Sequence, residues 1–483
     1  MMKTLLIGSG LSAWSVLTSL ENLENVYLID GSSDYEFADL KSSPHLGLKT
    51  KFGSAHSYAS ISELNISDSS NLRAPISHSR GGFSEVWGNG FTPYRFSELD
   101  SLGLISDNDI FLAMKEILEI IPFTHTRGEL DQRFGIEDVY KNSPSSPELP
   151  LHSRYLDILQ KREALGVKDG YLIGRPNLLL DSRSCTFCGL CLTGCPYGSL
   201  FDAGESINKM ILRGQLKSEN VLTGIVKQID SKAKNLEVIY ETKGLISKLE
   251  FDQVIVSAGA LSTAMILMQS GHLPNNFQVP DSQVFYTGYF SRKRMRIEVN
   301  KPETGQIVIY PDAPNSVDFQ MSCYAPSDVS QDRLSQMVVP RMLSWIKVPK
   351  IITERIIPVI GFLPQEVSGY LNIRLEKTGF NLQRVTNPDT NLVTRKIANR
   401  IKNTFRKMGF FMIPMSLVLP DPGSGFHIGA SLPLGGEYVN QMGSLISDPR
   451  IKIMDSSILP KIPAGAHSFL TMALIRHLIR KSL

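Results

Sequence analysis

The sequence predicts an α/β fold in which a parallel sheet is built from both ends of the chain and an antiparallel-sheet domain is inserted between them. Three observations predict this arrangement: a strand–turn–helix–strand unit at the N-terminus, a strand and helix at the C-terminus, and alternating apolar and polar residues between them. Residues 283–325 and 358–383 carry the alternation, which is typical of antiparallel strands with one solvated face.

The N-terminal unit contains an apolar strand at 3–7, a glycine-rich turn, a helix to about residue 23 and a second strand at 26–29. Gly8, Gly10 and Ala13 match the G-x-G-x-x-A pattern of Rossmann-like dinucleotide sites. The small residues allow a tight turn, a close approach to pyrophosphate and close helix packing. Asp30 ends the second strand, where a carboxylate can bind ribose hydroxyls. The unit therefore predicts a site for FAD or NAD rather than NADP.

The other elements follow from periodicity and turn residues. Residues 31–79 are polar and Ser-rich, and a Gly-rich loop with Trp87 follows them. The remaining expected elements are a helix at 105–121, strands within 220–260, a helix beginning after Gly259, a basic helix at 391–409, a strand and turn at 451–460 and a terminal helix within 464–483.

Composition excludes several classes of protein. With 42% hydrophobic and 20% charged residues among 483, the chain is expected to be globular. No run of about 18 apolar residues is present, so no transmembrane helix is predicted. The net charge of +3 is too small to indicate nucleic acid as a partner. Gly8 and Gly10 interrupt the first apolar run, so we interpret it as a strand and turn, not a signal peptide. We expect a cytoplasmic protein, with export beside a partner or peripheral membrane association left open.

A cysteine loop is the second notable pattern. Cys185, Cys188, Cys191 and Cys195 precede Pro196 with the spacing C-x2-C-x2-C-x3-C-P. This spacing is typical of iron–sulfur ligand loops in bacterial proteins. Either all four thiolates bind one cluster, or a remote ligand such as Cys323 replaces one of them. A zinc site with four cysteine ligands and disulfides or free thiols are the alternatives, although zinc pairs are usually separated by a longer loop.

The order of four segments resembles the glucose–methanol–choline (GMC) oxidoreductases. The glycine fingerprint comes first, then R-G-G-F-S-E-V-W-G-N-G at 80–90, V-I-V-S-A-G-A at 254–260, and D-S-S-I-L-P at 455–460. The resemblance implies FAD as cofactor and a discontinuous FAD domain. It also implies which residues lie near the cofactor. Gly81, Gly82, Ser84 and Trp87 would lie beside the flavin ring, Val221 and Leu222 near the adenine, and Asp455 near the ribityl–pyrophosphate portion. Ala258 and Gly259 would form a strand-to-helix turn beside the cofactor.

Two histidines fit the positions of the GMC active-site pair. His427 lies in G-S-G-F-H-I-G-A and His467 in A-G-A-H-S-F. Oxidation of an alcohol removes a hydroxyl proton and a carbon-bound hydride, and an imidazole that titrates near neutrality can take the proton. We expect His427 and His467 to act as base and hydrogen-bond partner. His56 and His477 are interpreted as packed or surface residues.

Within the same group, the cysteine loop is similar to that of bacterial FAD-dependent glucose and fructose dehydrogenases. Their pattern, C-x5-C-x3-C-P, matches Cys185, Cys191 and Cys195 and implies a 3Fe-4S cluster. Cys188 has no counterpart in that pattern, and a fourth thiolate ligand at this position would suit a 4Fe-4S cluster. Fungal and plant long-chain alcohol oxidases of the group carry a similar segment, so the loop alone does not identify a cluster.

The combined expectation is an FAD-dependent dehydrogenase that oxidises an alcohol group on a sugar, polyol or other polar metabolite. Electrons would pass from the flavin to an iron–sulfur cluster and on to an electron-transfer protein or quinone, with a small partner subunit as a further expectation. A reductase, a non-oxidative lyase and a non-catalytic subunit with a structural cysteine loop are the alternatives. The expected domains are 1–95, 176–275 and 420–483 for FAD, and 96–175 and 276–419 for substrate. Residues 328–360 are interpreted as an amphipathic cap over the substrate site, with a membrane-surface or partner-docking element as the alternative. The basic helix is interpreted as a solvated face.

Overall fold

The structure of the chain is a computed structural model. It describes residues 2–31, 66–68, 74–91, 107–124, 130, 149–162, 164, 170–188, 191, 195, 197–231, 234–296, 304–312, 319–325 and 349–482. Most of the polar segment 31–79, residues 328–348 of the expected cap, and His56 and Pro196 lie outside the described residues.

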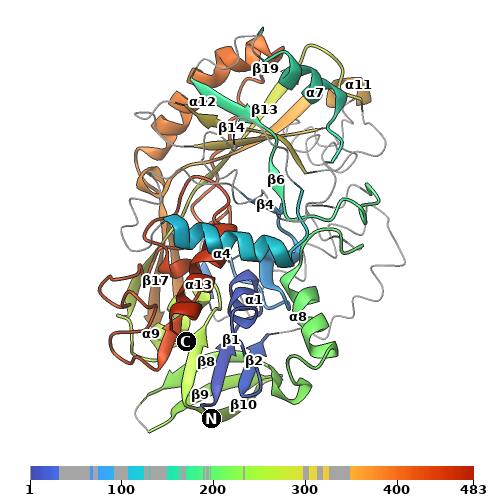
Figure 1. Cartoon of the computed structure of the whole chain (residues 1–483). Coiled ribbons are helices and arrows are strands. Elements are labelled where there is room, and N and C mark those ends of the chain that lie inside the picture. The colour runs from blue at the N-terminus through green and yellow to red at the C-terminus, as the bar shows by residue number, and fades with distance from the viewer. Residues whose placement is uncertain are drawn as a thin grey trace.

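A five-stranded parallel sheet forms the centre of the lower half of the molecule (Figure 1). Its order is β20–β11–β1–β2–β7, and every neighbouring pair is parallel. Leu6 in the central strand pairs with Leu28 on one side and Ile255 on the other, and all three are buried. The strands come from both ends of the chain, which confirms the predicted α/β fold. Their bounds are β1 Thr4–Ile7, β2 Val26–Asp30, β7 Val221–Thr223, β11 Gln253–Val256 and β20 Ile451–Ile453.

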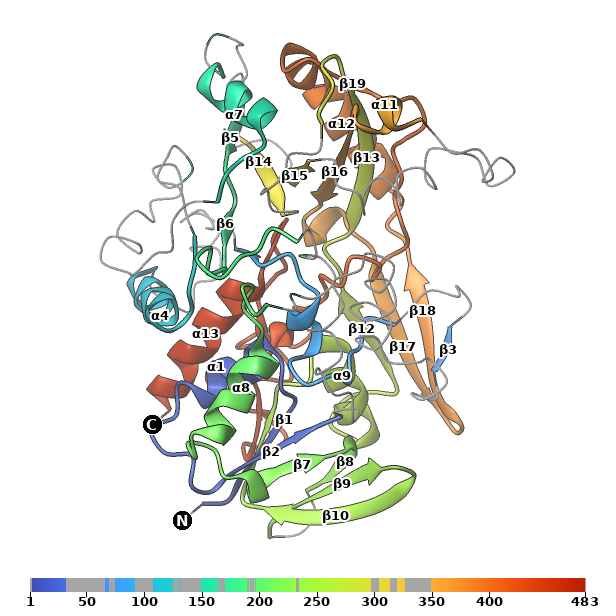
Figure 2. The same ribbon diagram turned by 90° about the vertical axis from the view of Figure 1, so that its right-hand side faces the viewer.

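Helices cover both faces of this sheet. Figure 2 shows α1, α8 and α13 on one side of it and α9 on the other. In the part of the chain that the structure describes, no helix has the length and apolar character needed to cross a membrane. The bounds are α1 Leu11–Leu17, α4 Asp107–Ile120, α8 Ala203–Leu212, α9 Ala260–Gln269 and α13 Ser468–Lys481.

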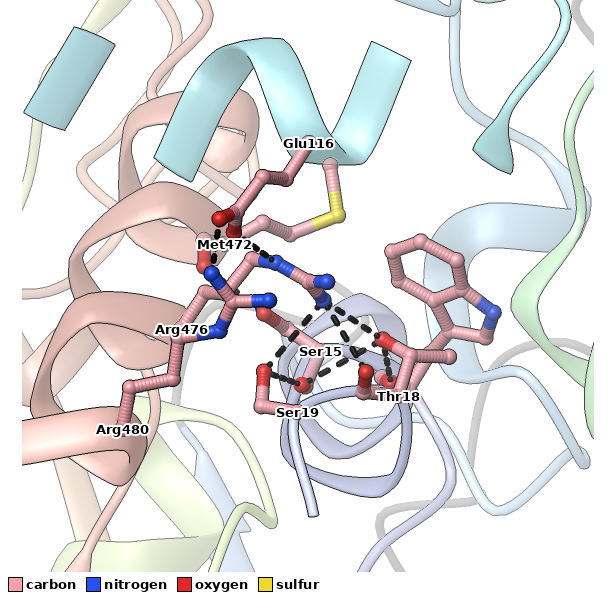
Figure 3. Close-up of polar contacts among 8 residues, drawn as sticks. Ser15, Thr18, Ser19, Glu116, Met472, Arg476 and Arg480 are labelled. Atoms are coloured by element: carbon pink, nitrogen blue, oxygen red, sulfur yellow. Dashed lines mark hydrogen bonds and ion pairs between the residues drawn. The ribbon is translucent and has the colours of Figure 1, made fainter. Parts of the chain in front are cut away.

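A buried arginine joins three of these helices (Figure 3). Arg476 of α13 is 4% exposed. Its Nε donates to the Glu116 carboxylate of α4 at 2.8 Å, and its Nη1 donates to the Thr18 carbonyl after α1 at 3.1 Å. Arg480 also pairs with Glu116. A cation at the C-terminal end of a helix is favourable, so Arg476 holds α13 against the end of α1.

Helix α1 is shorter than the sequence predicts. The Thr18 hydroxyl donates to the Trp14 carbonyl at 2.9 Å, and the Ser19 hydroxyl donates to the Ser15 carbonyl at 2.6 Å. Such side-chain bonds compete with helix continuation. The helix therefore ends at Leu17 rather than near residue 23.

A six-stranded antiparallel sheet forms the upper half of the molecule, in the order β19–β13–β16–β15–β14–β5 (Figure 1). Its core includes Tyr289 and Phe405, whose rings stack with centroids 4.0 Å apart. The predicted antiparallel strands are confirmed. The bounds are β5 Tyr171–Gly174, β13 Val284–Ser291, β14 Gly305–Pro311, β15 Gln320–Tyr324, β16 Ile356–Phe362, β19 Phe410–Met412, and the covering helices α7 Ser153–Gln160, α11 Lys350–Thr353 and α12 Thr390–Lys407.

Smaller sheets flank the two halves. One has the order β12–β17–β18–β3 and another β10–β9–β8, while β4 pairs with β6. Their bounds are β3 Ile66–Asp68, β4 Gly90–Phe91, β6 Asn177–Leu178, β8 Ile225–Asp230, β9 Leu236–Thr242, β10 Leu245–Phe251, β12 Asn276–Pro280, β17 Tyr370–Glu376 and β18 Gly379–Val385.

Candidate functional site

A cavity of about 310 Å³ opens where the strands of the parallel sheet end. The loops that follow β1, β2 and β11 line it, together with the Gly-rich loop at 81–87. Ligands of α/β proteins bind at the carboxyl ends of parallel strands, where the surrounding loops converge. Ten residues predicted from sequence line this cavity: Gly8, Gly10, Asp30, Gly81, Gly82, Ser84, Trp87, Ala258, Gly259 and His467.

Glycines form part of the cavity wall because side chains would not fit there. Gly8 has φ +102°, and a Cβ there would lie 2.3 Å from the Ser257 carbonyl oxygen. Gly81 has φ +92°, and a Cβ there would lie 2.6 Å from an Asp202 carboxylate oxygen. Both positions therefore require glycine. The resulting wall exposes backbone to a bound ligand, as a pyrophosphate site needs.

Asp30 is paired in this structure with a residue that the sequence did not single out. The Arg80 guanidinium bonds both Asp30 oxygens, with Nε–Oδ2 at 2.9 Å and Nη2–Oδ1 at 3.4 Å. Arg80 also donates to the Asn208 amide oxygen at 3.2 Å. Arg80 immediately precedes Gly81 in the predicted loop, and this position is the feature of the sequence that could have identified Arg80 as a residue of the site. The carboxylate expected to bind ribose thus has a cationic neighbour.

Three other predicted residues lie near the cavity without lining it. Ala13 is fully buried in α1. Val221 pairs with Leu28 in the sheet, while the cavity is lined by residues 224–227 farther along the chain. Asp455 is buried and accepts hydrogen bonds from the Gly259 amide at 3.0 Å and the Thr263 hydroxyl at 2.5 Å. Burial raises the Asp455 pKa, and these hydrogen bonds oppose the rise.

The two candidate catalytic histidines lie side by side. Their ring centroids are 5.3 Å apart, and the rings are nearly perpendicular at 87°. His467 lines the cavity, whereas His427 stacks in parallel on Phe362 with centroids 4.4 Å apart. The Nδ1 atom of each ring is buried, with no hydrogen-bond partner among the described residues. The fold thus brings together two imidazoles that are 40 residues apart in sequence.

Both imidazoles are uncharged at neutral pH. Burial, followed by the charge of the neighbouring His467, lowers the pKa of His427 to about 3. Burial lowers the pKa of His467 to about 4. A hydrogen bond to the Gly465 backbone acts in the opposite direction in both cases. A neutral imidazole has one nitrogen that accepts and one that donates, so each ring can receive a proton.

The His427 loop is held by a buried carboxyl group from the inserted region. The Gly423 amide donates to Asp281 Oδ2 at 2.7 Å, and the Ser282 amide donates to the His427 carbonyl at 3.0 Å. Burial raises the pKa of Asp281 to about 7, while hydrogen bonds from Gly423 and Ser282 and the charge of Arg384 oppose the rise. Asp281 lies 142 residues from Gly423, and no local pattern marks it.

The segment that follows the cysteine loop is part of the cavity's support. The Trp87 indole donates to the Phe201 carbonyl at 2.9 Å, and the Phe201 ring meets Trp14 edge-on with centroids 5.0 Å apart. Asp202 caps α8, since its carboxylate accepts from the Gly204 amide at 2.7 Å. Burial, followed by the charge of Glu85, raises the pKa of Asp202 to about 6. Aspartate is a preferred residue at the N-cap of a helix, and this preference could have identified Asp202 from the sequence.

Among the described residues, none of the four loop cysteines forms a disulfide. Burial raises the pKa of Cys185, and Cys195 and Cys188 add smaller rises, while the Phe187 backbone opposes them. Cys191 is 8% exposed and packs among leucines. Among the described residues, no three His, Cys, Asp or Glu side chains are grouped to hold a metal ion. As placed here, the thiols do not form a ligand set for a cluster.

Cys323, the alternative remote ligand, belongs to another part of the fold. It is fully buried on β15, in the core of the six-stranded sheet. Cys191 packs in a separate small cluster with Leu178, Leu180 and Leu200. Burial raises the Cys323 pKa far above the ordinary value, so this thiol stays protonated.

Comparison with known proteins supports the fold. A scan of protein-family models and a search of curated proteins each find no match to this chain. Among solved structures, the crystal structure of pyridoxine 4-oxidase from Mesorbium loti is similar, with a TM-score of 0.65 and 14% sequence identity. The alignment covers 100% of this chain and 99% of that one. At this level of identity, the likeness shows that the two chains share a fold.

Proposed function

We propose that the chain is an FAD-dependent oxidoreductase of the GMC type that oxidises an alcohol group on a polar metabolite. One observation carries the proposal: the cavity that begins at the Gly8–Gly10 turn is also lined by His467, whose ring lies beside that of His427. The shared fold with a pyridoxine 4-oxidase, whose name denotes an oxidation, supports the same class of reaction.

The residues present fit FAD. Gly8 and Gly81 leave parts of the wall free of side chains, and Gly10 caps α1 without a side-chain bond, which leaves its first amides available to phosphate. Trp87 and Phe426 line the cavity and offer flat surfaces to an aromatic ring. Bound FAD would supply the hydride acceptor for the reaction.

The histidines would handle the hydroxyl group. We assign proton acceptance to His467 because its ring lines the cavity and is neutral at physiological pH. His427 would hold the hydroxyl, since stacking on Phe362 fixes its ring plane. The Gly465 backbone favours the protonated form of each ring and would stabilise the imidazolium that proton transfer creates.

The test is flavin reduction under anaerobic conditions. The purified protein should contain FAD, released on denaturation, and an alcohol from a panel of sugars, polyols and pyridoxine should bleach its absorbance. His467→Asn should slow bleaching by about 10²–10⁴-fold while retaining FAD, because a positioned general base contributes on that order. His477→Asn, on the far part of α13, is the control and should bleach normally. Absence of bound FAD, or undiminished bleaching in the His467 variant, would contradict the proposal.

The electron acceptor is a narrower proposal. We propose a dehydrogenase that passes electrons to an electron-transfer protein or a quinone, on the support of the cysteine loop's spacing alone. The similar solved structure is named as an oxidase. Turnover with a quinone analogue under argon, but little oxygen uptake in air, is the expected result; rapid oxygen uptake would assign an oxidase instead.

An iron–sulfur cluster is a separate hypothesis. The spacing of Cys185, Cys188, Cys191 and Cys195 supports it, but the thiols as placed form no ligand set, so the reaction above includes no step through a cluster. Iron and acid-labile sulfide should be measured after anaerobic purification. Either four or three iron atoms per chain would support it, and the number would decide whether Cys188 is a ligand.

A further inference from the structure

Positive charge is concentrated at the end of the molecule farthest from the parallel sheet. Four described segments there, 153–162, 292–296, 351–355 and 389–407, contain fourteen Lys and Arg but only three Asp and Glu. Their net charge is +11, whereas the whole chain carries +3, so the remainder carries −8. These segments are therefore strongly positive even though the overall charge of the chain is small. We call these four segments the basic end.

The four segments form one continuous part of the structure. The Arg154 guanidinium donates to the Met408 carbonyl just after α12, and the Arg292 amide donates to the Gly409 carbonyl at 2.8 Å. The Arg355 guanidinium in turn donates to the Arg292 carbonyl at 2.6 Å. Figure 1 shows α7, α11, α12 and β19 together at the top of the molecule, opposite the parallel sheet.

Helix α12 contributes the largest share of the charge. Its 18 residues include six cations and no acidic residue. Ile397, Ile401 and Phe405 face the core. The opposite face is exposed, and four of its cations make no ion pair with any described residue: Arg395, Lys396, Lys402 and Arg406. Charge that the described residues do not neutralise is available to an anionic partner.

Exposed apolar side chains accompany these cations. Phe290 on β13 and Phe411 on the edge strand β19 are register partners, exposed to 38% and 42%. The Arg355 guanidinium lies over the Phe290 ring, 5.8 Å from its centroid. The other large exposed apolar residues of the same end are Leu156, Ile351, Ile352 and Leu392.

We infer that the basic end docks on an anionic lipid surface, with the cofactor cavity's half of the chain directed away from it. Lys and Arg near a membrane are attracted to anionic headgroups, and exposed Phe, Leu and Ile can enter the boundary with the acyl chains. A nucleic acid would leave the apolar residues without a role. A protein partner fits less well, because lysine is depleted in protein interfaces whereas Lys293, Lys396 and Lys402 are exposed here. The orientation follows from the position of the basic end, opposite the parallel sheet (Figure 1).

Vesicle co-sedimentation with the full chain tests the inference. The protein should bind phosphatidylcholine vesicles containing about 30% phosphatidylserine and not pure phosphatidylcholine, and about 0.5 M salt should release it, because exposed charges are screened at that ionic strength. The triple variant Arg395→Glu, Lys396→Glu, Lys402→Glu should bind at least about tenfold more weakly. Phe411→Ser should bind severalfold more weakly at low salt.

A matched control makes the same change of charge at the opposite end of the folded molecule. Lys209, Arg213 and Lys217, on and after α8, are exposed, and replacing all three by Glu should leave vesicle binding unchanged. Thermal unfolding and bound flavin should be equal in both triple variants, which separates docking from folding and from the proposed reaction. Equal weakening in the two triple variants, or no preference of the wild-type protein for anionic vesicles, overturns the inference.

Discussion

The glycine-walled cavity and the cysteine loop are both marked in the sequence by a few residues at fixed spacing, yet the structure assembles only the first. Gly8 and Gly81 specify backbone geometry, because their positive φ angles and close approaches tolerate no Cβ. The cysteines specify nothing about the backbone. The four cysteine side chains would come together only around a common ligand. Folding of the polypeptide alone does not require them to do so.

The two regions are nevertheless joined. Phe201 and Asp202 follow the cysteine loop, and they contact Trp87, Trp14 and Gly81 in the cavity's support. The segment just after the loop therefore has a structural role that is independent of what the thiols bind. Substitutions in the loop and in the segment after it separate these two roles.

The largest effect is expected at the glycine turn. In Gly8→Ala, the Cβ would meet the Ser257 carbonyl at 2.3 Å in a left-handed conformation, so the turn must move. We expect a loss of about 3 kcal/mol or more in unfolding free energy and loss of bound flavin. Urea unfolding and absorbance measure both. Gly244→Ala is the control, since φ is +82° there but no atom lies within 4 Å. Gly244→Ala should lower the unfolding free energy by only about 1 kcal/mol. If it lowered the unfolding free energy as much as Gly8→Ala does, the close approach of the Ser257 carbonyl would not be what requires glycine at position 8.

Phe201→Ala should have the next largest effect. It removes the edge-on contact with Trp14 and loosens the backbone that accepts the Trp87 indole. Removal of a well-packed aromatic ring typically costs about 3 kcal/mol, and we expect weaker flavin retention as well. Phe187→Ala, within the cysteine loop itself, should cost about 1 kcal/mol and leave the flavin bound, because Phe187 packs against a small cluster and not against the main core that Phe201 contacts. Equal flavin loss in both variants would show that the whole loop supports the cavity.

Asp202→Asn should change the pH dependence of stability. The folded-state pKa of Asp202 is raised to about 6, so the folded state binds a proton more tightly than the unfolded chain, whose carboxyl titrates near 4. The contribution of this proton to stability is complete below about pH 4 and disappears as pH rises through about 6. Asparagine keeps an oxygen for the α8 cap and cannot ionise. Relative to wild type, the variant should gain about 1–2 kcal/mol between pH 4 and pH 7 in urea titrations; a difference that does not vary with pH would contradict the raised pKa.

The sequence predicts the parallel sheet and the glycine turn because their determinants are local. Gly8, Gly10 and Asp30 lie within one strand–turn–helix–strand unit. The support of His427 is not local: Asp281 reaches Gly423 across 142 residues, and a buried aspartate has no periodic signature. Pairing of Arg80 with Asp30 likewise depends on the tertiary fold. Residues that shape the backbone can therefore be predicted, while side chains that meet through the fold cannot.

The smallest change in unfolding free energy is expected for substitutions of the loop thiols. Comparing this change with that caused by substituting the buried Cys323 tests whether the loop thiols bind a ligand. Cys185→Ser and Cys188→Ser change partly exposed groups and should each cost less than about 0.5 kcal/mol. Cys323→Ser places a hydroxyl in an apolar core, where the sulfur is fully buried, and should cost about 1–3 kcal/mol. If the loop thiols bind a cluster, the order reverses: the loop variants lose iron and become the less stable, because ligand binding would then contribute to folding. Iron content and unfolding free energy of the three variants therefore distinguish a ligand loop from a structural one.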